Sequence, residues 1–171
     1  MALLTAIALI IFIVETLIPL PVPVPGVKLG LSNVIILFAL FLNHTGKKRE
    51  SNALPYNIKL NNFDVFLILI CRIILGAFFT GRVITFAFSL CGGLFAFFAM
   101  ILMKKIVTDK QIWVCGAIGA ISHNTGQIII AIIITGTPSI IAYLPVLIIA
   151  GIITGVFTGL IAQFTLLRMA K

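Results

Sequence analysis

The chain has 171 residues, of which 61% are hydrophobic and only 9% are charged, and its mean hydropathy is +1.28. A water-soluble domain of this composition would expose too much apolar surface, so we exclude a soluble protein. The formal net charge of +8 is compatible with nucleic-acid binding only if the basic residues form a patch, and they do not.

Six apolar stretches follow one another, at residues 2–18, 31–42, 65–79, 83–103, 112–134 and 140–167. A helix perpendicular to a bilayer needs about 20 residues to cross it, so the second and third stretches must extend into their flanks. Only helices and closed barrels satisfy the backbone in lipid, and these runs lack the alternation of barrel strands. We therefore predict one all-α domain, 1–171, which is a polytopic membrane protein with six transmembrane helices.

Basic residues gather in alternate loops. The loops after the second and fourth stretches and the C-terminal end carry most of them: Lys47, Lys48, Arg49, Lys59, Lys104, Lys105, Lys110, Arg168 and Lys171. Lys28 and Arg82 fall in the other loops. The positive-inside rule then predicts a cell-membrane protein with both termini in the cytoplasm. Topology and anionic headgroups explain the positive charge, so we expect membrane lipid as a partner and no nucleic acid.

Between the first two stretches, residues 19–30 alternate prolines with apolar residues and end in Gly26, Lys28 and Gly30. Prolines at this spacing favour a stiff extended segment of polyproline type. Asn33 follows as the next helix begins. The segment either folds over the outer mouth as a lid, carrying Lys28 toward Glu15 or an anionic ligand, or is a rigid connector.

Ionisable residues inside the spans indicate a buried site, because a charge in hydrocarbon costs at least ~2.5 kcal/mol on insertion scales. Glu15 lies in the first stretch and Arg72 near the middle of the third. They either form a structural ion pair or line a ligand cavity. His123 and Gln127 share one face of the fifth helix, with Asn124 beside them. These three either hydrogen-bond between helices or contact a ligand.

Small residues at four-residue spacing in the last stretch, Gly151, Gly155 and Gly159, predict close helix packing inside the protein. Pro145 is expected to kink the same helix. Cys71, Cys91 and Cys115 are solitary thiols within spans, and we interpret them as apolar fillers. We expect neither a metal nor another cofactor.

The segment from Gly26 to Asn33 after the prolines, and the run from Ser122 to Gln127, make the chain resemble the Gx transporter family. That family also carries the label heptaprenyl diphosphate synthase component I, and the resemblance covers nearly the whole chain. It is similar in turn to the S components of energy-coupling factor transporters, six-helix proteins that work with a transmembrane T component and two ATPases. The resemblance implies an S-component-like bundle and such partners. Ala2 and Ala6 match the motif with which S components contact the T component.

The label of a synthase implies magnesium-binding aspartates, and the sequence lacks such a cluster. Its acidic residues, Glu15, Glu50, Asp64 and Asp109, are far apart. A phosphate-binding loop of the Gly-x-x-x-x-Gly-Lys type is also missing, so ATP hydrolysis would need a partner. We therefore expect no enzyme activity from this chain.

Several functions compete. The first is a substrate-binding subunit for uptake of a small anionic or amphipathic ligand, held by Glu15, Lys28, Asn33, Arg72, His123, Asn124 and Gln127. The second is a quinone- or flavin-handling subunit of a redox assembly, since relatives of the family look like components associated with flavin-based electron transfer. An accessory membrane subunit linked to polyprenyl diphosphate metabolism and a purely structural scaffold are the remaining alternatives.

Overall fold

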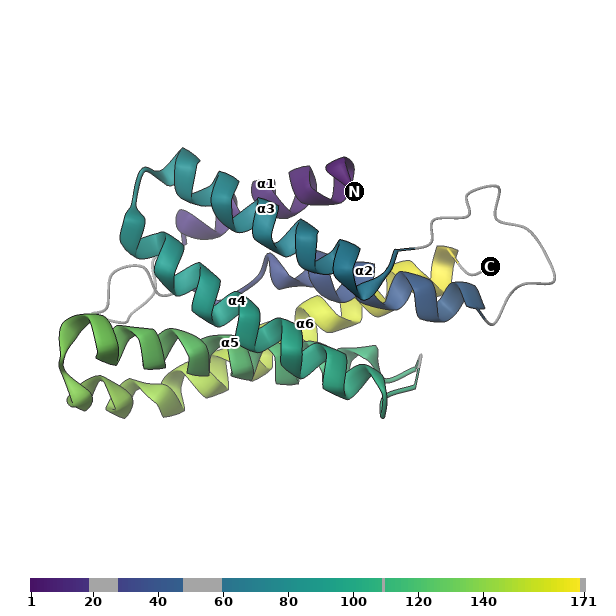
Figure 1. Ribbon diagram of the computed structural model, residues 1–171. Helices are drawn as coiled ribbons and strands as arrows, with labels where there is room; N and C mark the ends of the chain where they lie inside the picture. The colour runs from purple at the N-terminus through teal and green to yellow at the C-terminus, as the bar shows by residue number, and fades with distance from the viewer. Residues whose placement is uncertain (19–27, 48–59, 109, 170–171) are drawn as a thin grey trace.

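The computed structural model describes residues 1–18, 28–47, 60–108 and 110–169. Within these ranges the chain is all-helical (Figure 1). The elements are α1 (Ala2–Thr16), α2 (Asn33–Lys47), α3 (Asn62–Thr80), α4 (Val83–Lys104), α5 (Ile112–Thr135), the 3-10 helix η1 (Pro138–Tyr143) and α6 (Leu144–Met169). Each predicted apolar stretch corresponds to one α-helix, so the predicted all-α class is confirmed.

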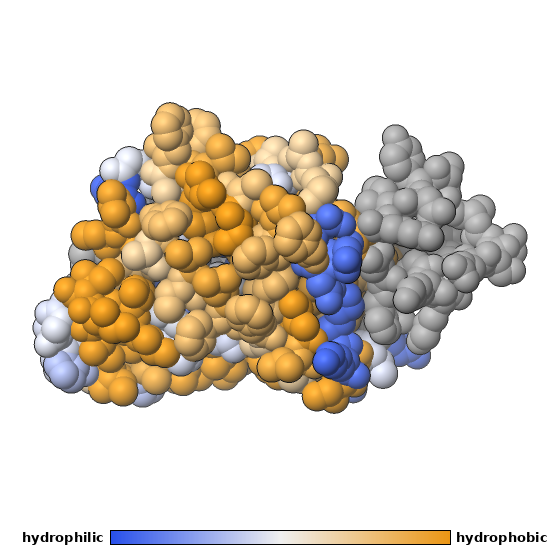
Figure 2. Space-filling model, viewed as in Figure 1, coloured by the Kyte–Doolittle hydropathy of each residue, from blue (hydrophilic) through white to orange (hydrophobic). Residues whose placement is uncertain are grey.

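Four helical runs are long and apolar enough to cross a membrane: α3, α4, α5 and the run Pro138–Met169 that joins η1 to α6. The helices α1 and α2 are shorter apolar helices, so their crossing stays a prediction. Large apolar side chains cover the outside, including Phe78 at 82% and Val83 at 83% exposure. Hydrophobic residues dominate the visible face in Figure 2. This surface fits a membrane-embedded protein.

The most extensive group of hydrophilic residues on the visible face lies at one end of the helix bundle, with smaller groups at the other end (Figure 2). The N-terminus, the end of α2, the α4–α5 connection and the end of α6 all lie at the first of these ends (Figure 1). Lys104 and Arg168 lie in the last turns of α4 and α6. The basic ends of α4 and α6 therefore lie at the same end of the bundle as the N-terminus. Residues 48–59 lie outside the described residues, and the position of both termini in the cytoplasm stays a prediction.

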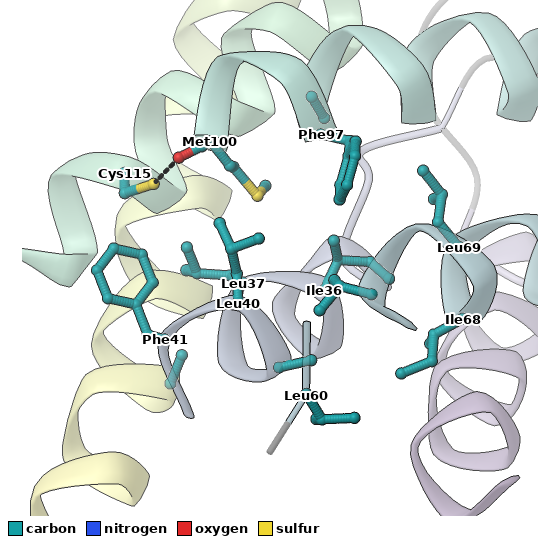
Figure 3. Packing of buried hydrophobic residues seen from close by; sticks show 14 of the residues in the cluster. Ile36, Leu37, Leu40, Phe41, Leu60, Ile68, Leu69, Phe97, Met100 and Cys115 are labelled. Atoms are coloured by element: carbon teal, nitrogen blue, oxygen red, sulfur yellow. Dashed lines mark hydrogen bonds between the residues drawn. The ribbon is translucent and has the colours of Figure 1, made fainter. Parts of the chain in front are cut away.

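Helix α2 is the centre of the bundle, because it contacts each of the other five α-helices. The others follow one another around it in the order α1, α3, α4, α5 and α6, and among the described residues α1 does not reach α6. Ile36, Leu37, Leu40 and Phe41 of α2 are at most 1% exposed. They point into a cluster with side chains of α3, α4 and α5 (Figure 3).

The start of α3 shows how a short apolar stretch becomes a full-length helix. The backbone N–H of Asn61 donates to Asp64 Oδ2 at 2.7 Å, and the N–H of Asn62 donates to Asn61 Oδ1 at 2.8 Å. This capping box satisfies donors that a helix start leaves free. The helix then runs 19 residues to Thr80, where Gly81 ends it with φ of 62°.

The expected kink at Pro145 is wrong. The helix α6 begins at Leu144, directly after η1, so Pro145 is its second residue. At the first turn of a helix the missing N–H of proline has no intrahelical partner to lose, and the fixed φ suits the helix. Pro145 therefore starts α6, and the change from 3-10 to α geometry takes place beside it.

The glycines of α6 bring its backbone against α5, as their spacing predicted. A Cβ at Gly155 would lie 2.7 Å from Ala117 Cα, and one at Gly159 would lie 2.6 Å from Trp113 Cα. On the facing helix, a Cβ at Gly116 would lie 2.5 Å from the carbonyl oxygen of Gly155. The prediction of close internal packing is confirmed.

Because backbone atoms cannot move aside as a flexible side chain can, we expect Gly155→Leu to destabilise the protein by about 1–3 kcal/mol through overpacking. Thermal unfolding in detergent measures the effect. Phe157→Leu is the matched control, since Phe157 is 62% exposed and faces away from this contact. Equal melting temperatures for Gly155→Leu and the wild type would contradict the close α5–α6 approach.

Candidate functional site

In the segment that leads into α2, Lys28, Gly30, Ser32 and Asn33 are buried, and Leu29 and Leu31 are partly buried. On one side Glu15 of α1 holds them, because its Oε1 accepts hydrogen bonds from the backbone N–H of Gly30 and of Leu31, the second at 3.1 Å. Glu15 is itself only 3% exposed. A carboxylate that accepts two backbone donors is well placed to fix a chain segment.

Helix α5 holds the same segment from the other side. The backbone N–H of Lys28 donates to Gln127 Oε1 at 3.1 Å, and Gln127 Nε2 lies 3.0 Å from His123 Nε2. A backbone N–H can only donate, so the amide oxygen of Gln127 faces Lys28 and its NH₂ group donates to the imidazole. His123 Nε2 is then an acceptor, which assigns the neutral tautomer with its proton on Nδ1.

Two glycines enclose the His123 ring. A Cβ at Gly30 would lie 2.9 Å from His123 Cδ2, and a Cβ at Gly92 of α4 would lie 2.8 Å from His123 Cε1. Gly30 also has φ of 79°, in the left-handed region that other residues rarely adopt. The imidazole therefore serves as a spacer between the Lys28–Asn33 segment and α4.

Arg72 of α3 is 1% exposed and reaches the start of α2. Its Nη1 donates to Ser32 Oγ, while its Nε and Nη2 have no hydrogen-bond partner in the described structure. Nε and Nη2 form one edge of the guanidinium, so a single edge of Arg72 is left for another acceptor.

Lys28 lies near Arg72 over a shared aromatic ring. Lys28 Nζ is 3.4 Å and Arg72 Cζ is 5.8 Å from the centroid of Phe12. Gly76 of α3 makes room for that ring, because a Cβ there would lie 2.5 Å from Phe12 Cε1. Sequence reasoning missed Phe12, although it precedes Glu15 by three residues and so shares its helix face.

The polar residues described so far form one buried cluster: Glu15, Lys28, Ser32, Asn33, Arg72, His123 and Gln127. Several polar atoms of this cluster have no hydrogen-bond partner among the described residues. They are Glu15 Oε2, Lys28 Nζ, Asn33 Nδ2, Arg72 Nε, Arg72 Nη2 and His123 Nδ1. Leaving a buried donor or acceptor unsatisfied costs about 1–3 kcal/mol each. Glu15 is hydrogen-bonded to backbone and to neither cation, so the two cations are not neutralised through a hydrogen-bonded ion pair.

Lys28 lies between α1 and α2, and its surroundings lower the affinity of its amine for a proton. Burial lowers the pKa of Lys28 from 10.5 to about 8, and the Glu15 carboxylate offsets part of this effect. Arg72 and Arg82 lower the pKa further. Lys28 therefore carries its charge at neutral pH and loses it just above.

Asn124 is the candidate that the structure does not bring to this cluster. Its Nδ2 donates to the backbone carbonyl of Leu147 in α6 at 2.6 Å, and a Cβ at Gly151 would lie 2.7 Å from the same nitrogen. Asn124 and His123 are neighbours on one helix, so their side chains leave it in different directions. Asn124 joins α5 to α6.

The other candidates lie away from the cluster. Ala2 and Ala6 are exposed on α1. The predicted polyproline segment at 19–27 lies outside the described residues. Cys115 packs in the core with its Sγ 3.6 Å from the Met100 carbonyl. Among the described residues, no three His, Cys, Asp or Glu side chains gather as metal ligands.

Comparison with known proteins identifies a family. The family model for heptaprenyl diphosphate synthase component I matches residues 4–49 and 53–166. No curated protein and no solved structure matches the chain. The matched ranges include every residue of the cluster.

We expect Gly30→Ala to lower the melting temperature more than Gly81→Ala does. Both glycines are left-handed, with φ of 79° and 62°, so each alanine costs about 1–2 kcal/mol of backbone strain. Only at Gly30 does the new methyl group also meet the His123 ring, whereas nothing lies within 4 Å at Gly81. Thermal unfolding of both variants in one detergent measures the difference, and equal losses would argue against a tightly enclosed imidazole.

Proposed function

The chain belongs to the heptaprenyl diphosphate synthase component I family, and we propose that it is a substrate-binding integral membrane subunit with no chemistry of its own. Its ligand is a small anionic or amphipathic molecule that is taken up across the cell membrane. The observation that carries this proposal is the pair of buried cations, Lys28 and Arg72, which both lie near the Phe12 ring and keep nitrogens with no hydrogen-bond partner among the described residues. Charged groups at membrane depth are expensive and usually serve a ligand pathway.

The contacts support a division of labour among the candidate residues. Glu15, Gln127 and His123 use their hydrogen bonds to hold the segment from Lys28 to Leu31. Their role is to position that segment. Lys28, Arg72 and Asn33 contribute donors that contact the ligand. Lys28 Nζ, Asn33 Nδ2 and the Nε and Nη2 atoms of Arg72 have no hydrogen-bond partner among the described residues. Asn124 supports the site indirectly, by fixing α5 to α6.

The membrane arrangement of this proposal has all six α-helices crossing the bilayer in an S-component-like bundle, with both termini in the cytoplasm. The site then opens toward the exterior, at the end where α1 leads into α2. The exposed pair Ala2 and Ala6 is free to dock a transmembrane coupling subunit, through which ATPases would drive release. Small residues suit such helix contacts because they let backbones approach.

A second function is favoured by the name of the family, in which "component I" implies at least one further component. The chain would then be an accessory membrane subunit that presents or receives a prenyl diphosphate for a partner enzyme. The two functions differ in their readout. An accessory subunit changes the rate of a partner synthase, whereas an uptake subunit changes the accumulation of its ligand in cells or vesicles.

The uptake function predicts that anions stabilise the purified protein through Arg72. In lipid nanodiscs, a screen of small carboxylates and phosphates should raise the melting temperature of the wild type. Arg72→Gln should weaken binding of the hit at least tenfold, since hydrogen bonds to charged groups contribute about 1.5–3 kcal/mol. Arg82→Gln is the matched control, because Arg82 is exposed at the start of α4. Unchanged affinity in Arg72→Gln would refute this site.

The affinity for an anion should also fall as pH rises. The pKa of Lys28 is about 8 in the free protein, so above that pH an anion can bind the charged lysine only if a proton is taken up. Affinity then decreases by up to about tenfold for each pH unit above 8. Glu15, Arg72 and Arg82 are the charged groups that act on Lys28.

Titration calorimetry between pH 6.5 and 9.5 measures this dependence. Lys28→Met should bind weakly and show a flat profile across the same range. A wild-type profile as flat as that of Lys28→Met would show that the lysine does not face the ligand.

A further inference from the structure

The cluster carries a net positive charge of one unit. Among the described residues that form it, Lys28 and Arg72 are cationic and Glu15 is anionic. The hydrogen bond from Gln127 makes His123 neutral. Burial favours the neutral acid at Glu15, whereas the two backbone hydrogen bonds to its Oε1 and the charges of Lys28 and Arg72 favour the carboxylate. We assign the carboxylate, because Gly30 and Leu31 both donate to a single oxygen. Arg82 has the smallest of the effects on Lys28, and because it is exposed, water weakens its interaction with the cluster.

Arg72 offers one specific edge to a ligand. Ser32 occupies Nη1, and the unpaired atoms Nε and Nη2 are the two donors on a common side of the guanidinium. Two parallel N–H donors match the two oxygens of a carboxylate or phosphate. Lys28 Nζ and Asn33 Nδ2 add further unpaired donors.

The start of α2 also favours an anion, although its first backbone N–H groups do not contact the ligand. The N–H groups of Asn33 and Val34 donate to the carbonyls of Gly30 and Leu31 at 3.0 and 3.1 Å. They are therefore engaged, and the side chains must supply the direct contacts. The peptide dipoles of α2 still place a partial positive charge at this end.

Glu15 sets an upper limit on the negative charge that the cluster accepts. Its Oε2 is buried, has no hydrogen-bond partner in the described structure and can only accept. It would repel a second negative charge, whereas a neutral hydroxyl or N–H group on the ligand would satisfy it. Adding one negative charge neutralises the cluster, and adding two or three leaves an uncompensated charge out of water.

Building on the proposed function, we infer that the site selects a singly charged oxyanion, a carboxylate or a phosphodiester, that carries a neutral hydrogen-bond donor nearby. It discriminates against the diphosphate that the family name contains, and Glu15 is the residue that determines this specificity. The same oxyanion chemistry occurs in soluble carboxylates and in the headgroup of an anionic phospholipid.

The experiment compares headgroups on one hydrocarbon tail. The full chain in phosphatidylcholine nanodiscs is titrated at pH 7.0 with farnesoate, farnesyl diphosphate and the neutral methyl ester of farnesoic acid. We expect farnesoate to bind at least tenfold more tightly than the diphosphate and the methyl ester. Tighter binding of the diphosphate would overturn this inference and leave the proposed function intact. If none of the three probes binds and the anion screen also finds no hit, the proposed function fails with it.

Glu15→Gln tests the cause of the selectivity. Glutamine keeps an acceptor for the N–H groups of Gly30 and Leu31 but removes the negative charge, so the preference for farnesoate over the diphosphate should shrink at least tenfold. An unchanged ratio in a folded Glu15→Gln protein would overturn the inference. Should that variant not fold, Lys28→Met serves in its place: it should lose at least tenfold in affinity for farnesoate and none for the methyl ester. Equal losses for both would overturn the inference.

A lipid arm separates the two sources of the oxyanion. Nanodiscs containing phosphatidylglycerol, whose headgroup is a singly charged phosphodiester with hydroxyl groups, replace those of phosphatidylcholine. If the occupant is a lipid, the melting temperature rises without added solute and farnesoate adds nothing further. If it is a soluble solute, the farnesoate response is the same in both lipids. Either pattern supports selection of a singly charged oxyanion if the rise in melting temperature is lost in Arg72→Gln. A rise in melting temperature that persists in Arg72→Gln counts against the inference.

Discussion

A guanidinium that is 1% exposed inside an apolar bundle needs partners, and the local structure around Arg72 follows from that need. Arg72 draws Ser32 and the start of α2 toward α3, which places Lys28 over the same phenylalanine ring. The segment then requires its own anchors, which Glu15 and Gln127 supply. Burial of one charge thus explains why residues from four separate parts of the chain meet in one place.

The sequence predicted the helices well because hydropathy and length respond to the bilayer itself. The predicted stretch 112–134 and the observed α5, Ile112–Thr135, differ by one residue. Two features could not be predicted in this way. From the sequence Pro145 is expected to kink a continuous helix, but the chain forms a 3-10 helix before it and α6 begins only at Leu144. The central place of α2 depends on its contacts with the five other α-helices. Such tertiary contacts cannot be predicted from local sequence patterns.

Most of the candidate site residues could be predicted from the sequence, because a polar side chain buried in an apolar span costs free energy unless it has a partner or a function. Their roles could not be assigned in this way. His123 looks like a ligand contact from its type alone, yet the hydrogen bond from Gln127 and the glycines around the ring use its surface for packing. Asn124, next in sequence, turns to α6 instead. Phe12 could not be predicted as a site residue, because nothing in the sequence distinguishes it from the other apolar residues of its helix.

The enclosure of α2 has a consequence for how the protein responds to its lipid. Bilayers differ in thickness, and helices in contact with acyl chains adapt by tilting or by distorting the bilayer around them. Helix α2 contacts five other helices and buries Ile36, Leu37, Leu40 and Phe41, so this part of it packs against protein and need not match the hydrocarbon span. Stretching or thinning of the membrane would act first on the outer helices, and the buried polar residues at the start of α2 would be less affected.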